Sequence, residues 1–164
     1  MGESPSLPEL YDASYGRLVL QMFALCGDLA DAEDAVQEAF VKAISKGRSF
    51  AGIRNPEAWL RTVALNHQRN SWRHAKVVRR FATVVPGPRS VPALGPDHVA
   101  VVRALADLDP DQRHVVVLHY LADLGIAEIA EELGVPEGTV KSRLSRGRSR
   151  LAPLLDEREE TDHV

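Results

Sequence analysis

Cations and serines follow one another closely in residues 141–150, KSRLSRGRSR. If this stretch is helical, Val140 and Leu144 share one face, and short polar or basic side chains occupy the opposite one. That opposite face would carry Lys141, Ser142, Ser145, Arg146 and Ser149. Arginine and lysine contact phosphate oxygens and guanine edges, and serines let a helix approach them closely. The pattern therefore favours DNA binding; the simpler alternative is a solvated basic face.

The preceding residues predict the helix-turn-helix that would present this face. Ile126, Ile129 and Leu133 have the spacing of one apolar helix face, and Gly134 is suited to end that helix. Val135 and Pro136 form the turn, and the second helix is expected to begin near Pro136. A short helix, a turn with glycine and a basic second helix are the usual parts of this DNA-binding motif.

A second basic block lies in residues 51–80, which hold seven lysines or arginines and one acid. Its helical part carries Arg61, Arg69, Arg73, Lys76, Arg79 and Arg80, with Asn66, Asn70 and Trp72 interleaved. Cations that follow a backbone, beside rings and amides that meet unstacked bases, suit single-stranded or partly melted nucleic acid. Trp59 lies on the apolar stripe of the same helix and is expected to be core.

An acidic face is predicted on the helix before this block. The apolar stripe of that helix consists of Ala32, Ala35, Val36, Ala39, Phe40, Ala43 and Ile44. The opposite face carries Asp31, Asp34, Gln37, Glu38 and Val41. Such a face is usually just solvated, and it adds nothing to DNA affinity. It is also suited to dock a basic protein partner.

The sequence offers little for catalysis. It has no Gly-rich phosphate loop and no zinc-protease pair of histidines, and its six histidines are scattered. Cys26 is the single cysteine, so it cannot form an internal disulfide and is expected to be a small core residue. We therefore predict a protein that is not an enzyme and uses no cofactor or metal.

The 164 residues are 45% hydrophobic and 26% charged, which is typical of a soluble protein. They contain no apolar run of about 18 residues, and the N-terminal residues do not have the pattern of a secretory signal. We expect no membrane association and a cytoplasmic location.

Every segment outside residues 81–96 has helical periodicity, so the predicted fold class is all-α. Four prolines between Pro86 and Pro96 mark residues 81–96 as an extended linker between two small helical domains. Helices are expected from Leu7 to near Gly27, over residues 32–44, from Pro56 to about Arg80, from Val99 to Leu108, from Asp109 to about Leu121, from Ile126 to Gly134 and from near Pro136 onward. Asn55 and Asp109 are the expected N-caps of two of them, with Gln112 placed to bond back to Asp109.

Four blocks in this order resemble the bacterial RNA polymerase sigma factors, and more narrowly their two-domain extracytoplasmic-function (ECF) group. The blocks are DAEDAVQEAF (31–40), NPEAWL (55–60) before a basic helix, the Pro-rich linker, and GTVKSRL (138–144) in the helix-turn-helix. The resemblance implies a sigma-2 domain over residues 6–80, the linker over 81–96 and a sigma-4 domain over 97–155. The acidic residues 156–164 are expected to form a disordered tail.

The resemblance also implies a role for each set of residues. The residues implied to dock on the β′ clamp helices of core RNA polymerase are Asp31, Asp34, Gln37 and Glu38. The residues implied to bind the melted −10 element are Arg48, Arg54 and Asn55 in a base-capturing loop, and Asn66, Arg69, Asn70, Trp72 and Arg73 on the next helix. The residues implied to bind the −35 duplex are Lys141, Ser142, Arg143, Ser145, Arg146 and Arg148.

The implied function is a sigma factor that recognises −35 and −10 promoter elements and initiates transcription of a specific regulon. The implied partners are core RNA polymerase, through the β′ clamp helices and the β flap, promoter DNA, and an anti-sigma factor. The alternative is a free-standing helix-turn-helix regulator that acts as a dimer without docking on the polymerase. The acidic face discriminates between the two, because only a sigma factor needs it.

Overall fold

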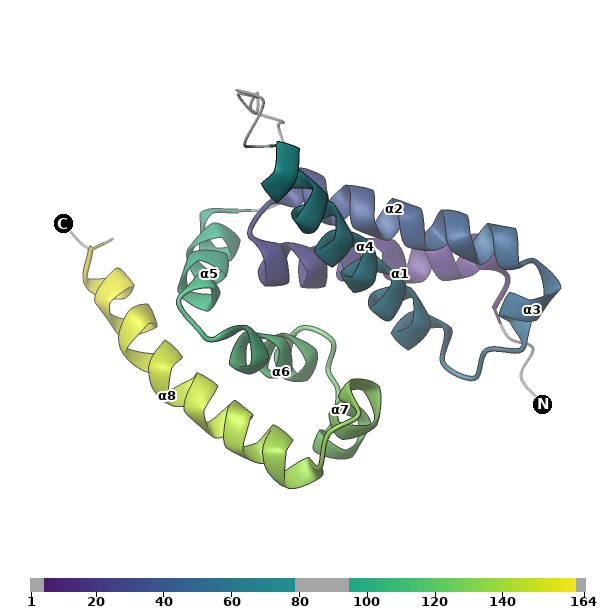
Figure 1. The fold of residues 1–164 in the computed structure, drawn as a ribbon. Helices are drawn as coiled ribbons and strands as arrows, with labels where there is room; N and C mark the ends of the chain where they lie inside the picture. Colours follow the sequence, from purple (N-terminus) through teal and green to yellow (C-terminus); the bar gives the residue numbers. More distant parts are fainter. Residues whose placement is uncertain (1–4, 79–94, 162–164) are drawn as a thin grey trace. The chain divides into compact units, whose positions relative to one another are not determined.

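The computed structural model describes residues 5–78 and 95–161, with side chains for residues 5–71 and 95–154. These residues form eight helices and no strand, which confirms the predicted all-α class. The chain divides into two compact units, residues 1–22 with 28–91 and residues 23–27 with 92–164 (Figure 1). Most of the predicted linker lies outside the described residues. None of the described helices is long and apolar enough to span a bilayer.

The first two helices begin at capping side chains. α1 (Leu7–Cys26) follows Ser6, whose backbone N–H and hydroxyl both donate to Glu9 Oε2 at 2.8 Å. These hydrogen bonds lower the pKa of the Glu9 carboxyl. α2 (Leu29–Lys46) follows Asp28, whose Oδ1 accepts from the Asp31 N–H at 3.0 Å. Between them Gly27, the predicted end of the first helix, has φ +77°, a conformation that favours glycine.

The core of the first unit is centred on α2 and α4 (Pro56–Val78), which pack along their lengths. The buried face of α2 consists of Ala32, Ala35, Val36, Ala39, Phe40 and Ala43, as predicted. Ile44 was expected to extend this stripe, but it is 65% exposed, because it lies about 40° beyond Phe40, outside the edge of the buried face. α4 buries Leu60 and Ala64, and the Asn55 cap is confirmed, since Asn55 Oδ1 accepts from the Ala58 N–H at 3.0 Å.

The second unit contains α5 (Pro96–Ala106), α6 (Pro110–Tyr120), α7 (Ile126–Leu133) and α8 (Glu137–Thr161). Pro96 was predicted to end the linker, but it is the first residue of α5, where a proline needs no N–H partner. Leu108 was expected within this helix; it is buried in the turn that follows it.

Asp109 occupies the predicted N-cap position of α6, but its side chain makes no capping hydrogen bond within the described residues. Its Oδ2 instead pairs with Arg150 Nη1 on α8 at 3.2 Å. Gln112 is buried, and its Oε1 has no partner among the described residues, so the predicted bond back to Asp109 is wrong. The ion pair of Asp109 with Arg150 on α8 replaces the predicted cap, and local sequence does not reveal such a pairing between helices.

Arg113 closes the C-terminal end of α5 from the neighbouring helix. Its Nε donates to the Leu105 carbonyl at 2.9 Å, and its Nη2 donates to the carbonyls of Ala106 and Leu108 at 3.0 and 3.1 Å. The last carbonyls of a helix have no partner within it, so a guanidinium satisfies several at once. This role of Arg113 depends on how α5 and α6 pack and has no signature in the sequence.

The helix-turn-helix forms as predicted. Gly134 ends α7 with φ +65°, and the Val135 N–H donates back to the Ala130 carbonyl at 3.1 Å. α8 then runs without a break to Thr161, through Pro153. The predicted disordered tail is therefore wrong for the backbone of residues 156–161, which continues this helix.

Candidate nucleic-acid and protein interfaces

The exposed face of α8 is the face expected from the sequence. Val140 and Leu144 are buried, with 0% and 4% exposure. The residues on the opposite side are all exposed: Lys141, Ser142, Ser145, Arg146 and Ser149. Lys141 and Arg146 are the long side chains in this group, and neither pairs with an acid among the described residues. Lys141 and Arg146 thus lie on either side of a stripe of serines, whose side chains are short enough to let the helix approach a DNA groove closely.

The other arginines of α8 hold the helix in its own unit. Arg143 pairs with Asp111 at 3.1 Å, and Arg150 pairs with Asp109 at 3.2 Å. These two arginines are seven residues apart, so they lie on one flank of the helix.

Arg148 makes the corresponding contact on the other flank. Its Nε donates to the Tyr120 hydroxyl, and its guanidinium carbon lies 5.5 Å from the centre of that ring. Of the three arginines predicted for the −35 element, Arg146 is exposed and pairs with no acid among the described residues. Arg143 and Arg148 instead contact Asp111 and Tyr120 of their own unit.

A second exposed polar stripe runs along α4. Asn66, Arg69 and Asn70 are exposed, as a strand-binding surface requires. Thr62, which the sequence analysis did not select, lies one turn before Asn66 and is also exposed. The side chains of Trp72 and Arg73, predicted for the same stripe, lie outside the described residues.

Arg61 was included in the basic block but does not belong to this surface. It is 4% exposed, with Nη1 3.7 Å from Glu57 Oε1 and 3.4 Å from Gln21 Oε1. Glu57 also pairs with Arg17 at 3.0 Å. Arg61 therefore links α4 to α1 inside the unit and is unavailable to nucleic acid.

Residues 48–55, expected to be a base-capturing loop, include one helical turn, α3 (Arg48–Ala51). Arg48 and Arg54 are exposed, and Asn55 is exposed while its Oδ1 caps α4. The segment thus presents two cations to solvent at the start of α4, on the same unit as the α4 stripe.

The exposed face of α2 changes character along its length. Asp31, Asp34 and Gln37 are exposed, and Glu38 is half-buried. One turn further on, Val41 and Ile44 are 52% and 65% exposed. Exposed aliphatic side chains rimmed by polar residues mark this face as a candidate protein interface.

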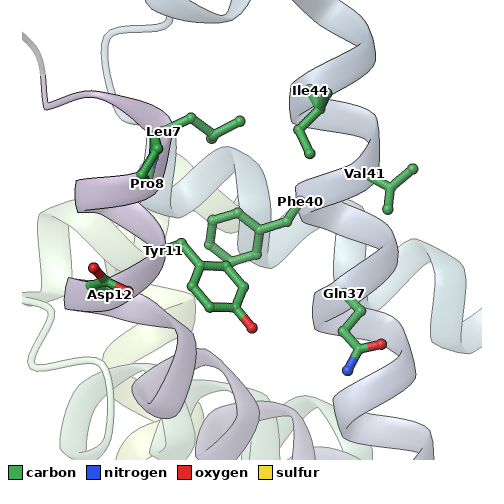
Figure 2. A pocket seen from close by; sticks show the side chains of 8 residues that line it. All are labelled: Leu7, Pro8, Tyr11, Asp12, Gln37, Phe40, Val41 and Ile44. Carbon is green, nitrogen blue, oxygen red and sulfur yellow. The ribbon is translucent and has the colours of Figure 1, made fainter.

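An open groove of about 560 Å³ adjoins this face between α1 and α2 (Figure 2). Its lining is Leu7, Pro8, Tyr11, Asp12, Gln37, Phe40, Val41 and Ile44. The Tyr11 ring stacks on Tyr15 at 4.7 Å between centroids and meets Phe40 edge-on at 4.9 Å. Partial burial, with smaller contributions from Tyr15 and Asp12, raises the pKa of Tyr11.

Sequence reasoning missed the α1 wall of this groove. Leu7 and Tyr11 are one turn apart, a signal that was present but could not say which helix they face. The structure shows that they extend the α2 face, so acidic and apolar parts form one continuous candidate docking surface, which comprises Asp34, Gln37, Glu38 and the groove.

Two family models match the chain, "Sigma-70 region 2" over residues 10–77 and "Sigma-70, region 4" over residues 98–151. The ECF RNA polymerase sigma factor SigL of Mycobacterium tuberculosis is 35% identical, over 94% of this chain and 92% of its own length. The chain belongs to the ECF RNA polymerase sigma factors. An RNA polymerase sigma-E factor of Streptomyces antibioticus is 30% identical over 96% of this chain and 89% of its own.

Solved structures agree with this membership. The sigma factor RpoE of Bartonella quintana, solved in complex with the anti-sigma factor NepR, has a TM-score of 0.72 and 28% identity, covering 91% of this chain and 96% of that one. CnrH, solved with the cytosolic domain of CnrY, has a TM-score of 0.69 and 26% identity, covering 92% and 88%. In this sigma factor, region 2 contains most of the docking surface and the α4 stripe, and region 4 contains the exposed α8 face.

Proposed function

We propose that this sigma factor brings core RNA polymerase to promoters through three separate surfaces. The docking surface of α1 and α2 binds the β′ clamp helices, the α4 stripe with residues 48–55 holds the melted −10 strand, and the α8 face reads the −35 duplex. The β flap is the expected partner of the second unit. The polymerase does the chemistry, in the cytoplasm, and the chain is not itself an enzyme.

The observation that carries this proposal is the acidic and apolar docking surface. DNA is polyanionic, so Asp34 and Glu38 only weaken its binding, and the apolar groove does nothing for it. DNA binding by itself has no use for such a surface, whereas a polymerase subunit must bury one against its partner. An anti-sigma factor, as in the RpoE complex, is the expected competitor for these surfaces.

The test of the proposal is co-elution of the full chain with purified bacterial core RNA polymerase on a sizing column at low and high salt. A 1:1 complex that initiates transcription from a cognate promoter is expected. Failure to co-elute, with dimeric binding to duplex DNA, would instead favour the free-standing regulator.

The two kinds of α8 arginine predict different effects of the same substitution. Arg146→Ala is expected to weaken −35 duplex binding by about 1–3 kcal/mol, with preference lost at one base position, if the guanidinium reads a base. It should leave the unfolding temperature unchanged, because Arg146 has no partner among the described residues. Duplex affinities measured by fluorescence anisotropy over a panel of single-base variants provide the readout.

Arg143→Ala is the matched control on the same helix. Its partially buried pair with Asp111 contributes at most about 1 kcal/mol to stability, so a small loss of stability and little loss of DNA affinity are expected. Equal losses of DNA affinity from both variants would contradict the division into reading and holding arginines. An equal loss over all sequences from Arg146→Ala would make that residue a phosphate contact.

A further inference from the structure

Residues 48–55, which the resemblance implies to be a base-capturing loop, have an ordered and partly helical backbone. The Phe50 N–H donates to the Gly47 carbonyl and the Ile53 N–H donates to the Phe50 carbonyl, both at 3.0 Å. The Ser49 hydroxyl donates to the Lys46 carbonyl at 2.7 Å. Gly47 supports the entry into this turn with φ +55°, which a larger residue would adopt only with strain.

Phe50 anchors the middle of this segment. Its side chain is 9% exposed, whereas Arg48, Ser49, Ala51 and Gly52 around it are all exposed. Its ring lies 5.3 Å from the Trp59 ring, at 70°, in the edge-to-face geometry that aromatic pairs prefer. Trp59, which the sequence placed in the core, is half-buried and serves here as the partner of Phe50.

The far end of the segment is fixed as well. Asn55 Oδ1 accepts from the Ala58 N–H at 3.0 Å, and the Asn55 carbonyl accepts from the Trp59 N–H at 3.1 Å. The segment is therefore tied to the first turn of α4 at two places, through Phe50 and through Asn55. The side chains left facing solvent include the cations Arg48 and Arg54.

We propose that Phe50 and Trp59 are positioning residues that hold residues 48–55 ready to receive an unstacked base of the melted −10 strand. This proposal rests on the proposed function. Extracting a base from the stack is costly, and an ordered segment avoids a further entropic cost of folding on the DNA. Phe50 acts from the interior, through the backbone turn it anchors, while the exposed residues meet the strand.

The test uses the full chain assembled with core polymerase, on a promoter first selected from random duplex DNA by that holoenzyme. 2-Aminopurine replaces one −10 base at a time, and its fluorescence rises when the base unstacks. Phe50→Ala is expected to reduce the equilibrium constant for unstacking by about tenfold, since the segment must then order itself on binding. Holoenzyme formation and binding to a −35 duplex should be unchanged.

Conservative variants separate positioning from direct contact. Phe50→Leu and Trp59→Phe keep an apolar anchor, so unstacking within about threefold of the parent is expected. Loss of unstacking in Phe50→Leu as large as in Phe50→Ala, at unchanged thermal stability, would mean that the ring itself stacks on the base and would overturn the proposal. An unchanged signal in Phe50→Ala would overturn it too.

Trp59 provides a second pair of variants should Phe50→Ala unfold the unit. Trp59→Ala removes the ring that Phe50 meets edge-on, so it should reduce unstacking, whereas Trp59→Phe keeps an aromatic partner and should retain it. Equal loss in both, at unchanged thermal stability, would contradict positioning through the aromatic pair. Failure of the parent chain to form a holoenzyme would count against the proposed function alone.

Discussion

Reversing two charges on α2, in the variant D34K/E38K, is expected to weaken binding to core RNA polymerase by about 2–3 kcal/mol, or roughly 30- to 150-fold. Asp34 is exposed and Glu38 half-buried on the docking surface, beside apolar side chains that a partner would cover. Covering that surface brings the carboxylates close to basic groups of the partner. Lysines there would meet like charge at the same distances. Titration of labelled protein with core polymerase measures the change.

The neutral variant D34N/E38Q is the graded control, and it should lose less than half of that binding free energy. Neither variant removes an apolar contact, so both should retain the helical circular dichroism and unfolding temperature of the parent. Binding to an isolated −35 duplex should also persist, because the second unit is unaltered. Undiminished polymerase binding in D34K/E38K would show that the docking surface lies elsewhere.

The caps and the buried faces were predictable because they depend on local chemistry. Asn55 before a proline, Gly27 and Gly134 act through hydrogen bonds and backbone conformations within a few residues. The stripe of Ala35, Val36 and their neighbours follows from helical periodicity alone. For the same reason, the exposed side of α8 emerged from the positions of Val140 and Leu144.

Partners between helices could not be predicted in the same way. Asp109 has the residue type of an N-cap, yet Arg150 on another helix holds its carboxylate. Periodicity places Arg143 and Arg148 beside a DNA-facing surface, but it cannot show that Asp111 and Tyr120 occupy them. Such pairings depend on how α6 and α8 pack.

The docking surface combines both kinds of information. The acidic half on α2 was visible in the sequence as a face with no other use. The apolar half was hidden, since Ile44 reads as part of a core stripe and Tyr11 lies on another helix. Only packing of α1 against α2 turns these residues into one groove (Figure 2).

Enlarging Gly147 is expected to destabilise the second unit strongly. A Cβ at this position would lie 2.7 Å from Val116 Cγ2, and Val116 is itself buried on α6 with 4% exposure. Val116 is β-branched, and its side chain has little rotamer freedom to move away from an added Cβ, so α6 and α8 must separate. Gly147→Val should therefore cost about 3 kcal/mol, and Gly147→Ala about 1 kcal/mol, after its gain in helix propensity. Hydrogen exchange of the α6 and α8 amides, read by mass spectrometry, localises the loss.

Gly138→Ala is the matched control, because the same substitution in the same helix meets no atom within 4 Å. It should leave stability unchanged or slightly raised. Combining Gly147→Ala with Val116→Ala removes the clashing methyl, so the double variant should be more stable than the sum of the two single effects predicts. Additive losses would instead show that the contact with Val116 does not limit the position of α8.

A glycine inside α8 lowers helix propensity, so its presence needs a compensating reason. The close approach of α8 to α6 at Gly147 supplies one. Arg143, which pairs with Asp111 on α6, and Arg150, which pairs with Asp109 just before α6, lie on either side of Gly147 along α8. A larger residue would push α8 outward and strain both pairs. We therefore expect Gly147→Ala to reduce −35 duplex affinity as well as stability, while unstacking of the −10 base, which depends on the first unit, stays at the parent level.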